Sequence, residues 1–434
     1  MTLDQSPYQG YLYAYPHKTA YRQLAPRRPL SEVWAPERQD ALFGYVHLPF
    51  CEMRCGFCNL FTRANPPAAQ VTAYLAQLRR QAVAVRQSLA GEASFAQLAI
   101  GGGTPTYLTA DELESLFEIV EVAFGSDHRP LSVETSPATA TADRLAVLAA
   151  HGTTRVSMGI QSFLDAEAHA AGRPQRLADV LAALEVIRTA GIPVLNIDLI
   201  YGIDGQTAQT WQHSLDEALR WQPEELYLYP LYVRPLTGLG RRAGGREGWD
   251  SQRQELYHQA VEVLTAAGYE QQSMRQFRRA GAPAVEGPDY CCQDDGMVGL
   301  GCGARSYTTS LHYSFDYAVG VSEVRAVIDD YLSRPADDFR YAEIGFDLDG
   351  TEQRRRWLLK SLLRRTGVDA AAYRQRFGTA HTDDFPQLKE LTARGWLHDD
   401  HCTLTSAGLA HSDAIGPWLV SGPVREAMGA YVAR

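Results

Sequence analysis

Residues 45–58 read YVHLPFCEMRCGFC, an apolar run followed at once by three cysteines. The run begins at residue 42, as LFGYVHLPF, and has the length and composition of a buried strand. Cys51, Cys55 and Cys58 then lie within eight positions, at spacings of four and three. This stretch therefore predicts a strand whose end carries a cluster of sulfur ligands.

Further apolar runs follow this strand, and amphipathic segments of helical length separate them. The runs are FAQLAIGGG, LSVETSP, TRVSMGIQSF, IPVLNIDLIYG and ELYLYPLYV, which begin at residues 95, 131, 154, 192 and 225. The helical segments are 109–124, which opens with Thr109 and an acidic first turn, and 141–151, 176–190 and 207–221. Strands that alternate with helices are typical of βαβ units, so we expect an α/β fold with a partial (β/α)6 barrel.

Polar residues gather where these predicted strands end. The cysteine loop follows the first strand, GGGTP follows the second, and Glu134, Gln161 and Asp198 lie at the ends of later ones. Ligands of parallel α/β folds bind at the carboxyl ends of the strands. We therefore expect these groups to converge on one rim of the barrel.

The sequence predicts four parts. They are an N-terminal extension (1–40), the core barrel (41–240), barrel completion with substrate-side elements (241–339) and a small C-terminal winged-helix-like domain (340–434). A glycine- and arginine-rich loop at 236–249 closes the barrel section, and the region 250–335 is predicted to be less regular. Helices near 352–367 and 385–395, with a hairpin at 396–408, define the last part.

Composition excludes several classes of protein. The chain has 434 residues, 45% hydrophobic and 21% charged, and contains no apolar run long enough to cross a bilayer. Its start lacks a basic segment followed by an apolar one, so we expect a cytoplasmic protein that has no membrane partner. A net charge of -10 argues against a general nucleic-acid surface.

The cysteine triplet indicates metal chemistry, because reducing cytosol disfavours disulfides. Three thiolates can hold three irons of a [4Fe–4S] cluster and leave the fourth open. A structural zinc site is the alternative, but no second CxxC follows and His47 is the nearby candidate for a fourth ligand.

The CxxxCxxC pattern, with Phe57 before its last cysteine, resembles the signature of the radical SAM superfamily. The wider phrase is similar to the HemN-like branch, related to oxygen-independent coproporphyrinogen III dehydrogenase. The resemblance extends through YAYPHKTAYR, GGGTPTYLT, VETSP, RVSMGIQSF, NIDLIYG, VGLGCGARSY and LTARGWL. It implies a [4Fe–4S] cluster, S-adenosylmethionine, and an external electron donor such as flavodoxin or ferredoxin.

The resemblance also assigns residues one by one. Cys51, Cys55 and Cys58 match the metal ligands. The matches to cofactor-binding positions are Phe57, Gly102, Gly103, Thr104, Gln161, Arg173 and Asp198. Tyr45 and Glu134 match catalytic positions that face the cofactor. The structural alternatives are that Tyr45 is an aromatic residue packed in the barrel and that Glu134 is a carboxylate hydrogen-bonded at a strand end.

The shared motifs leave the reaction open. The branch includes methyltransferases and cyclopropanases that use a second S-adenosylmethionine, enzymes that oxidatively decarboxylate a porphyrinogen, and a non-catalytic haem chaperone. The dehydrogenase has a fourth cysteine where this chain has Leu60, which argues against coproporphyrinogen as substrate. We expect methyl or methylene transfer to a small organic molecule, using two molecules of S-adenosylmethionine. Cys291, Cys292 and Cys302 are predicted to be structural or substrate-facing thiols.

Overall fold

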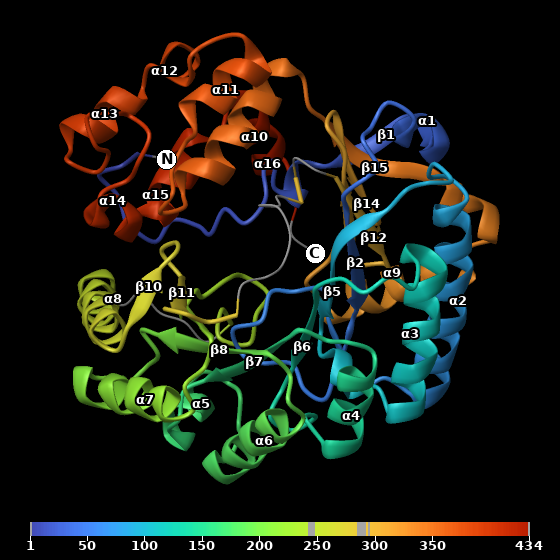
Figure 1. Cartoon of the computed structure of the whole chain (residues 1–434), viewed down its shortest axis with the longest axis horizontal. Coiled ribbons are helices and arrows are strands. Elements are labelled where there is room, and N and C mark those ends of the chain that lie inside the picture. Colours follow the sequence, from blue (N-terminus) through green and yellow to red (C-terminus); the bar gives the residue numbers. More distant parts are fainter. Residues whose placement is uncertain (1, 242–247, 284–291, 294–295, 433–434) are drawn as a thin grey trace.

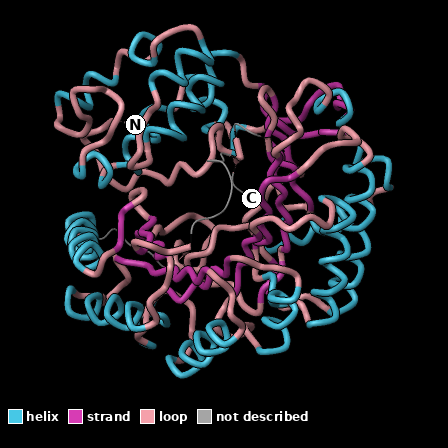
Figure 2. Tube along the Cα trace, in the orientation of Figure 1, coloured by secondary structure: helices cyan, strands magenta, loops and turns pink. Residues whose placement is uncertain are grey.

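A long mixed sheet forms the frame of the molecule (Figure 1). The computed structural model describes residues 2–241, 248–283, 292–293 and 296–432. In Figure 2 the strands follow an arc along the inner side of a ring of helices. The hollow side of the arc is covered by the N-terminal segment and the helical C-terminal region (Figure 1).

Six strands of this sheet run parallel and neighbour one another in chain order. They are β2 (Leu42–Leu48), β5 (Phe95–Gly102), β6 (Leu131–Thr135), β7 (Arg155–Gln161), β8 (Val194–Tyr201) and β9 (Glu225–Pro230). All six predicted runs form strands. With the helices between them they make the predicted partial (β/α)6 barrel, so this expectation is confirmed.

A helix follows each of these strands and packs on the outer face. These helices are α2 (Ala68–Arg86), α3 (Ala110–Phe124), α4 (Ala142–Ala150), α6 (Leu177–Thr189), α7 (Ala208–Arg220) and α8 (Trp249–Ala266). At the start of α3, Thr109 and Glu112 form a reciprocal capping box that satisfies two backbone donors. The same helix buries Leu113, Leu116 and Phe117, and each such burial stabilises by about 1.5–3 kcal/mol.

The sheet extends beyond the barrel at both edges. Outside β9 lie β11 (Gln276–Arg279) and β10 (Tyr269–Gln271). Outside β2 lie β12 (Met297–Leu300), β13 (Arg305–Tyr307), β14 (Leu311–Ser314), β15 (Tyr341–Asp347) and β1 (Arg22–Pro29). The region predicted to be less regular therefore contains α8 and several strands. The strands β10 to β14 have only three or four residues each, which is too short to show a clear period-two signal.

The C-terminal region is helical. It comprises α10 (Gly350–Leu362), α11 (Ala370–Phe377), α12 (His381–Asp384), α13 (Leu388–Ala393), α14 (Ser406–Ala410), α15 (Ser412–Leu419) and α16 (Gly422–Gly429). The predicted hairpin is present as an antiparallel bridge between Leu397 and Leu404. Leu3, Tyr15 and Ala20 of the N-terminal segment are buried in the core of this region, so the two chain ends pack as one body.

Short elements complete the chain. They are η1 (Lys18–Ala20), α1 (Leu30–Trp34), β3 (Phe50–Cys51), β4 (Arg63–Ala64), η2 (Pro105–Tyr107), α5 (Asp165–Ala170), α9 (Val321–Ser333) and η3 (Ala336–Arg340). β15 lies in the main sheet although it falls within the predicted part 340–434; the four-part division itself stays a prediction.

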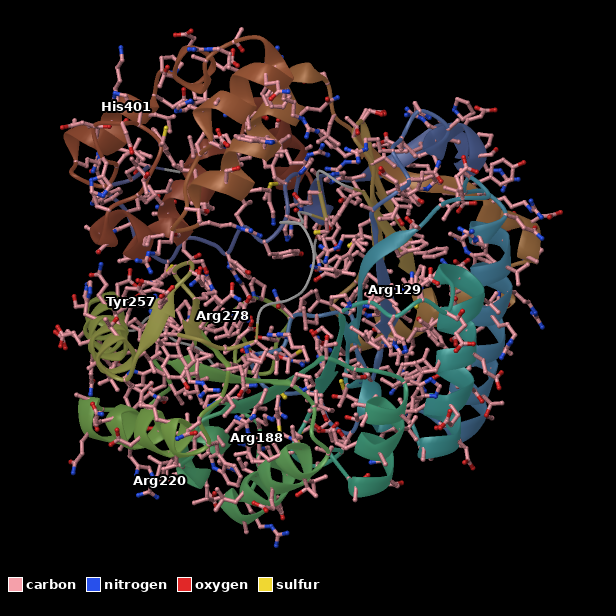
Figure 3. The ribbon with its side chains drawn as sticks, viewed as in Figure 1. Arg129, Arg188, Arg220, Tyr257, Arg278 and His401 are labelled. Atoms are coloured by element: carbon pink, nitrogen blue, oxygen red, sulfur yellow. The ribbon has the colours of Figure 1, made fainter. Side chains whose placement is uncertain are left out.

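The outer and inner sides of the barrel differ in their charged side chains. Figure 3 shows Arg220 projecting outward at the end of α7, whereas Arg278 lies on the inner side, where its Nη1 is 2.6 Å from Glu225. Among the described helices, none combines the length and apolar character that crossing a membrane would need.

Candidate functional site

The three cysteines lie on one loop held at both ends by the backbone. Cys51 ends β3, which pairs with β4, and Cys58 donates its N–H to the carbonyl of Cys55 at 3.1 Å. At the apex, Gly56 donates its N–H to the Gly172 carbonyl at 2.9 Å, and its own carbonyl accepts the N–H of Leu239 at 2.7 Å. A Cβ on Gly56 would lie 2.9 Å from the Ala171 carbonyl oxygen, so only glycine fits this close contact.

Each thiol has a different polar neighbour. Thr104 Oγ1 donates to Cys51 Sγ at 3.7 Å, and Arg173 Nη1 donates to Cys55 Sγ at 3.9 Å. Cys58 Sγ lies 3.9 Å from Thr62 Oγ1. Burial raises the pKa of both Cys51 and Cys55, while the hydrogen bond from Thr104 and the charge of Arg173 lower those two pKa values respectively. Each of these two sulfurs thus has a donor that favours its thiolate.

The arrangement suits a cluster better than a single ion. Within the described ranges, no three His, Cys, Asp or Glu side chains lie close enough together to hold one metal ion. A [4Fe–4S] cube spreads its ligands over separate irons and does not need that closeness. His47, the candidate fourth zinc ligand, is buried with Nε2 3.0 Å from the Phe61 carbonyl oxygen and Nδ1 3.2 Å from the Tyr45 hydroxyl.

The glycine loop after β5 lies against the start of the cysteine loop. Gly103 N–H donates to Leu48 at 2.7 Å and Thr104 N–H donates to Phe50 at 2.7 Å. A Cβ on Gly103 would lie 2.4 Å from the Phe50 carbonyl oxygen, and Gly102 has φ +109°. The backbone therefore reaches a position here that side chains would block.

Inside the barrel, a cavity of about 230 Å³ opens along the inner faces of the parallel strands. Its lining residues are Tyr45, Ala99, Ile100, Gly101, Ser132, Glu134, Arg155, Ser157, Asn196, Asp198, Tyr227 and Tyr229. Three predicted site residues, Tyr45, Glu134 and Asp198, thus share one space.

Two carboxyl groups dominate this cavity. Glu134 accepts the N–H of Gly102 at 3.0 Å; its accessible surface faces the cavity, and burial together with the charge of Asp198 raises its pKa to about 7. Asp198 accepts from Asn196 Nδ2 at 2.7 Å and from Ser157 Oγ at 3.4 Å. Burial raises the pKa of Asp198 to about 6 despite these donors. Both groups change charge near neutral pH.

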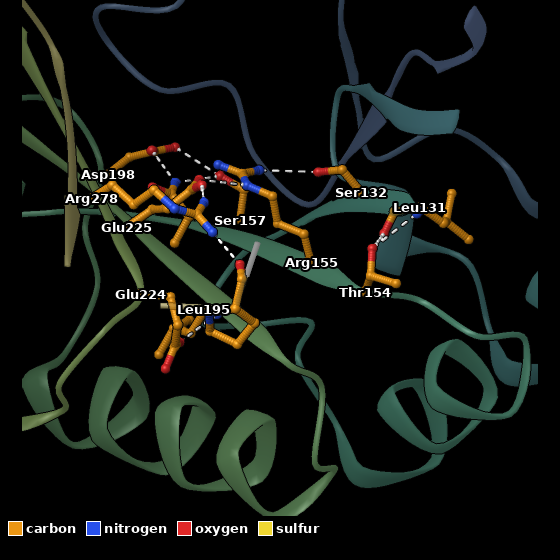
Figure 4. A network of polar contacts seen from close by, with 12 residues as sticks. Leu131, Ser132, Thr154, Arg155, Ser157, Leu195, Asp198, Glu224, Glu225 and Arg278 are labelled. Atoms are coloured by element: carbon orange, nitrogen blue, oxygen red, sulfur yellow. Dashed lines mark hydrogen bonds and ion pairs between the residues drawn. The ribbon is translucent and has the colours of Figure 1, made fainter. Parts of the chain in front are cut away.

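An ion-pair network holds the floor of the cavity (Figure 4). Arg155 Nε is 2.8 Å from Glu225, which also accepts from Arg278, and Arg155 Nη1 donates to Ser132 at 3.0 Å. Glu225 is therefore shared by two arginines, whereas the two carboxyl groups lining the cavity are not ion-paired with a described side chain.

Gln161 and Arg173 lie together beside the cysteine loop. Gln161 is buried at φ +72°, an uncommon conformation for a residue other than glycine. A Cβ on Gly159 would be 2.6 Å from Gln161 Nε2 and 3.5 Å from Arg173 Nη1, so both side chains fold over this glycine. Arg173 has no carboxylate partner within the described part of the chain; its Nε donates to Gln175 at 3.2 Å. The positive charge of Arg173 is therefore available to an anionic ligand.

Phe57 is placed differently from the other predicted residues. Its ring packs in an apolar cluster with Ala171, Ile200, Ile203 and Leu231, outside the lining of the cavity. A contact between Phe57 and the cofactor stays a prediction, as do the roles of the other assigned residues.

The sequence predictions missed several cavity residues. Arg155 and Ser157 alternate along β7, Asn196 precedes Asp198 by two positions on β8, and Tyr227 and Tyr229 alternate on β9. Successive side chains of a strand face opposite sides, so residues two positions apart face the same side, and the residues named above all face the interior. That period-two pattern is the signal by which they could have been found.

Cys302 and Cys292 have surroundings different from those of the loop cysteines. Cys302 is buried with its N–H donating to the Tyr74 hydroxyl at 3.2 Å, which fits a structural thiol. Cys292 packs partly buried beside Met297 and Tyr307, and Cys291 lies outside the described residues.

Comparison with known proteins gives consistent matches. The Radical SAM superfamily model matches residues 45–218, and the HemN C-terminal domain model matches residues 348–411. The heme chaperone HemW of Bacillus subtilis is 27% identical over 86% of this chain and 98% of its own length. The oxygen-independent coproporphyrinogen III oxidase of Cereibacter sphaeroides is 25% identical over 81% of this chain and 78% of its own. The structure of the coproporphyrinogen III oxidase HemN of Escherichia coli superimposes with a TM-score of 0.76 at 22% identity, covering 97% of this chain and 98% of that one, which shows a shared fold.

Proposed function

Because the chain belongs to the radical SAM superfamily and carries a HemN C-terminal domain, we propose that it is an enzyme that acts on a small organic molecule in the barrel cavity. Members of this superfamily use a [4Fe–4S] cluster and S-adenosylmethionine. In our proposal Cys51, Cys55 and Cys58 hold the cluster. The observation that carries the proposal is that the cysteine loop contacts the glycine loop, which in turn contacts Glu134, one of two cavity carboxyl groups that form no ion pair with a described side chain.

The residues beside the loop fit S-adenosylmethionine by charge. Arg173, which has no described carboxylate partner, would pair with the carboxylate of the methionine part. Gly102 and Gly103 let the backbone of the glycine loop pack closely against His47 and Phe50, next to the cysteine loop. Asp198 and Gln161 offer an acceptor and an amide to ribose hydroxyls. When bound, cluster and cofactor together supply a 5′-deoxyadenosyl radical by one-electron cleavage of the sulfonium bond, with the electron from a donor such as flavodoxin or ferredoxin.

The finer proposal is methyl or methylene transfer, with a second S-adenosylmethionine as the carbon donor. Glu134 and Tyr45 line the cavity away from Arg173, and an ionised Glu134 would attract a sulfonium or ammonium group where water is excluded. Leu60 stands where the dehydrogenase has a fourth cysteine, and its side chain is 49% exposed. This difference favours carbon transfer over oxidative decarboxylation, the activity that the coproporphyrinogen oxidase relatives suggest.

The N-terminal segment favours an enzyme over a haem chaperone, the function named for the HemW relatives. Gly10 N–H donates to Asp413 at 3.0 Å, and the Tyr11 ring lies 6.4 Å from the ring of Tyr229, which lines the cavity. The segment therefore lies beside the cavity, where it would limit the access of water to a reactive radical.

Product analysis tests this proposal. Anaerobically reconstituted protein is incubated with reductant, S-adenosylmethionine and candidate substrates, and mass spectrometry follows 5′-deoxyadenosine and S-adenosylhomocysteine. Both products together indicate carbon transfer, and 5′-deoxyadenosine without S-adenosylhomocysteine indicates decarboxylation or simple hydrogen abstraction. Stable haem binding with neither product would instead support the chaperone function.

A further inference from the structure

Three positive side chains from distant parts of the chain converge beside the cysteine loop. Lys18 lies in η1, Arg234 follows β9 and Arg305 begins β13. We call these three residues the cationic cluster. All three charges act on His17, whose pKa burial and these charges lower to about 3. Their convergence depends on the N-terminal segment, which crosses between the C-terminal helices and the barrel (Figure 1).

Aromatic groups position each member of the cluster. Lys18 Nζ lies 3.4 Å from the ring centre of Tyr317, whose hydroxyl donates to the Asn59 carbonyl at 2.8 Å. Arg305 Nη1 donates to the Tyr13 hydroxyl at 2.8 Å, and Arg234 Cζ lies 4.5 Å from the ring centre of Tyr232. These contacts orient the three side chains but supply no negative charge. Burial and the charge of Arg305 lower the pKa of Lys18 well below its ordinary value, so a bound anion would favour the protonated form of Lys18.

The cluster lacks the carboxylate partner that three other interior arginines have. Arg275 pairs with Asp413, Arg155 with Glu225 and Arg253 with Asp250. Within the described ranges, by contrast, none of Lys18, Arg234 and Arg305 forms an ion pair. Holding unpaired charges inside protein is costly, and an anionic ligand would remove that cost.

The cluster is also adjacent to the proposed reaction space. Lys18 lies over the ring of Tyr317, whose hydroxyl bonds to the residue that follows Cys58. Arg305 bonds to Tyr13, which packs against the same apolar cluster as Tyr45. Gly303, two residues before Arg305, lies over the His47 ring, where a Cβ would be 2.2 Å from Nε2. An anion bound by the cluster would therefore lie between the cysteine loop and the cavity. Arg173 contacts the loop at another cysteine, Cys55.

We propose that the cationic cluster binds an anionic group of the substrate, a carboxylate or a phosphate, so that the substrate of this protein is an anion. The inference rests on the proposed function, because it assumes that a substrate enters this space. Lys18 and Arg305 are the specificity-determining residues in it, and each would form charge-assisted hydrogen bonds with the anion.

Equilibrium binding tests the inference without turnover. Isothermal titration calorimetry is performed on the anaerobic holoprotein saturated with S-adenosylmethionine. One arm uses tricarballylate, a second uses inorganic phosphate, and the uncharged propane-1,2,3-tricarboxamide is the control. We expect one site for at least one anion, none for the triamide, and about tenfold or greater weakening in Lys18→Gln and in Arg305→Gln. Binding of tricarballylate would show that the cluster takes a carboxylate, and binding of inorganic phosphate would show that it takes a phosphate.

Matched variants separate the cluster from general electrostatics. Lys18→Arg keeps the charge and should keep binding. Lys389→Gln and Arg374→Gln remove exposed charges of the C-terminal helices and should change the dissociation constant less than about twofold. Variants are compared at equal iron content, which shows that the fold is retained. Because Lys18 and Arg305 are substituted separately, the two variants test the cluster independently.

Three results would overturn the inference: no anion binds, the cluster variants bind as well as the parent protein, or saturation with S-adenosylmethionine abolishes anion binding. The last result would assign the cluster to the cofactor. Formation of 5′-deoxyadenosine is measured separately. If the protein forms 5′-deoxyadenosine but binds no anion, only this inference is contradicted. If the protein binds anions but never forms 5′-deoxyadenosine, only the proposed function is contradicted.

Discussion

The substitution Asp413→Asn should strongly reduce the free energy of unfolding of this protein. Asp413 accepts from Arg275 and from the Tyr232 hydroxyl, and its side chain and that of Arg275 are only 2% and 4% exposed. Arg275 Cζ also lies 3.9 Å from the ring centre of Tyr11. The pair therefore joins α15, the start of β11 and the N-terminal segment.

The magnitude follows from the burial of this pair. The amide keeps the shape of the carboxylate but removes its charge, so Arg275 is left as an uncompensated buried cation. Removing one partner of a buried pair costs about 3–5 kcal/mol, a large fraction of the roughly 5–15 kcal/mol by which domains are stable. By the same reasoning, the double variant Arg275→Met with Asp413→Leu should recover much of the loss, because neither charge remains.

Urea unfolding followed by tryptophan fluorescence measures this cost. Asp40→Asn is the matched control, since Asp40 pairs with Arg38 at 2.8 Å but is 68% exposed, and it should change the free energy of unfolding far less than Asp413→Asn. Equal free energies of unfolding for the two single variants would refute the reasoning. A double variant less stable than Asp413→Asn would contradict the electrostatic explanation.

Further predictions concern the site. Anaerobic reconstitution should give about four irons and four sulfides per chain, lost when any of the three loop cysteines becomes alanine and kept in Cys402→Ala; iron analysis checks this. Arg173→Ala and Asp198→Ala should keep the iron but weaken S-adenosylmethionine binding about tenfold or more by calorimetry, and unchanged affinity in both would contradict their assignment. Turnover should rise with pH through about 7 as Glu134 ionises. Glu134→Gln should remove that rise and impair product formation more than cofactor cleavage. If the variant and the parent protein have the same pH profile, Glu134 is not the titrating group.

The barrel was predictable because local signals and the fold agree. The six apolar runs are strands, and Thr109 caps its helix as its position after the glycine loop indicates. Glu134 was predictable as a strand-end residue, since it is next to the last residue of β6, whereas Asp198 lies within β8, three residues before its end. Their neighbours Arg155 and Tyr229 follow the same period-two alternation.

The cationic cluster was not predictable, and the reason is physical. Lys18 and Arg305 are far apart in sequence, and neither lies in a periodic pattern that marks an inward face. Only tertiary packing of the N-terminal segment against β13 brings them together, through the bond from Arg305 to Tyr13. The short strands β12 to β14 escaped prediction for a related reason, since pairing partners rather than composition define them.

Reductive cleavage of S-adenosylmethionine tests the central claim most directly. The reconstituted protein is reduced anaerobically with dithionite, mixed with S-adenosylmethionine alone, and assayed for 5′-deoxyadenosine by mass spectrometry. We predict that 5′-deoxyadenosine accumulates with the parent protein and with Cys402→Ala, and is absent with Cys55→Ala. Parent protein that contains its full iron and sulfide and binds S-adenosylmethionine, yet forms no 5′-deoxyadenosine, would contradict the assignment of this chain as a radical enzyme.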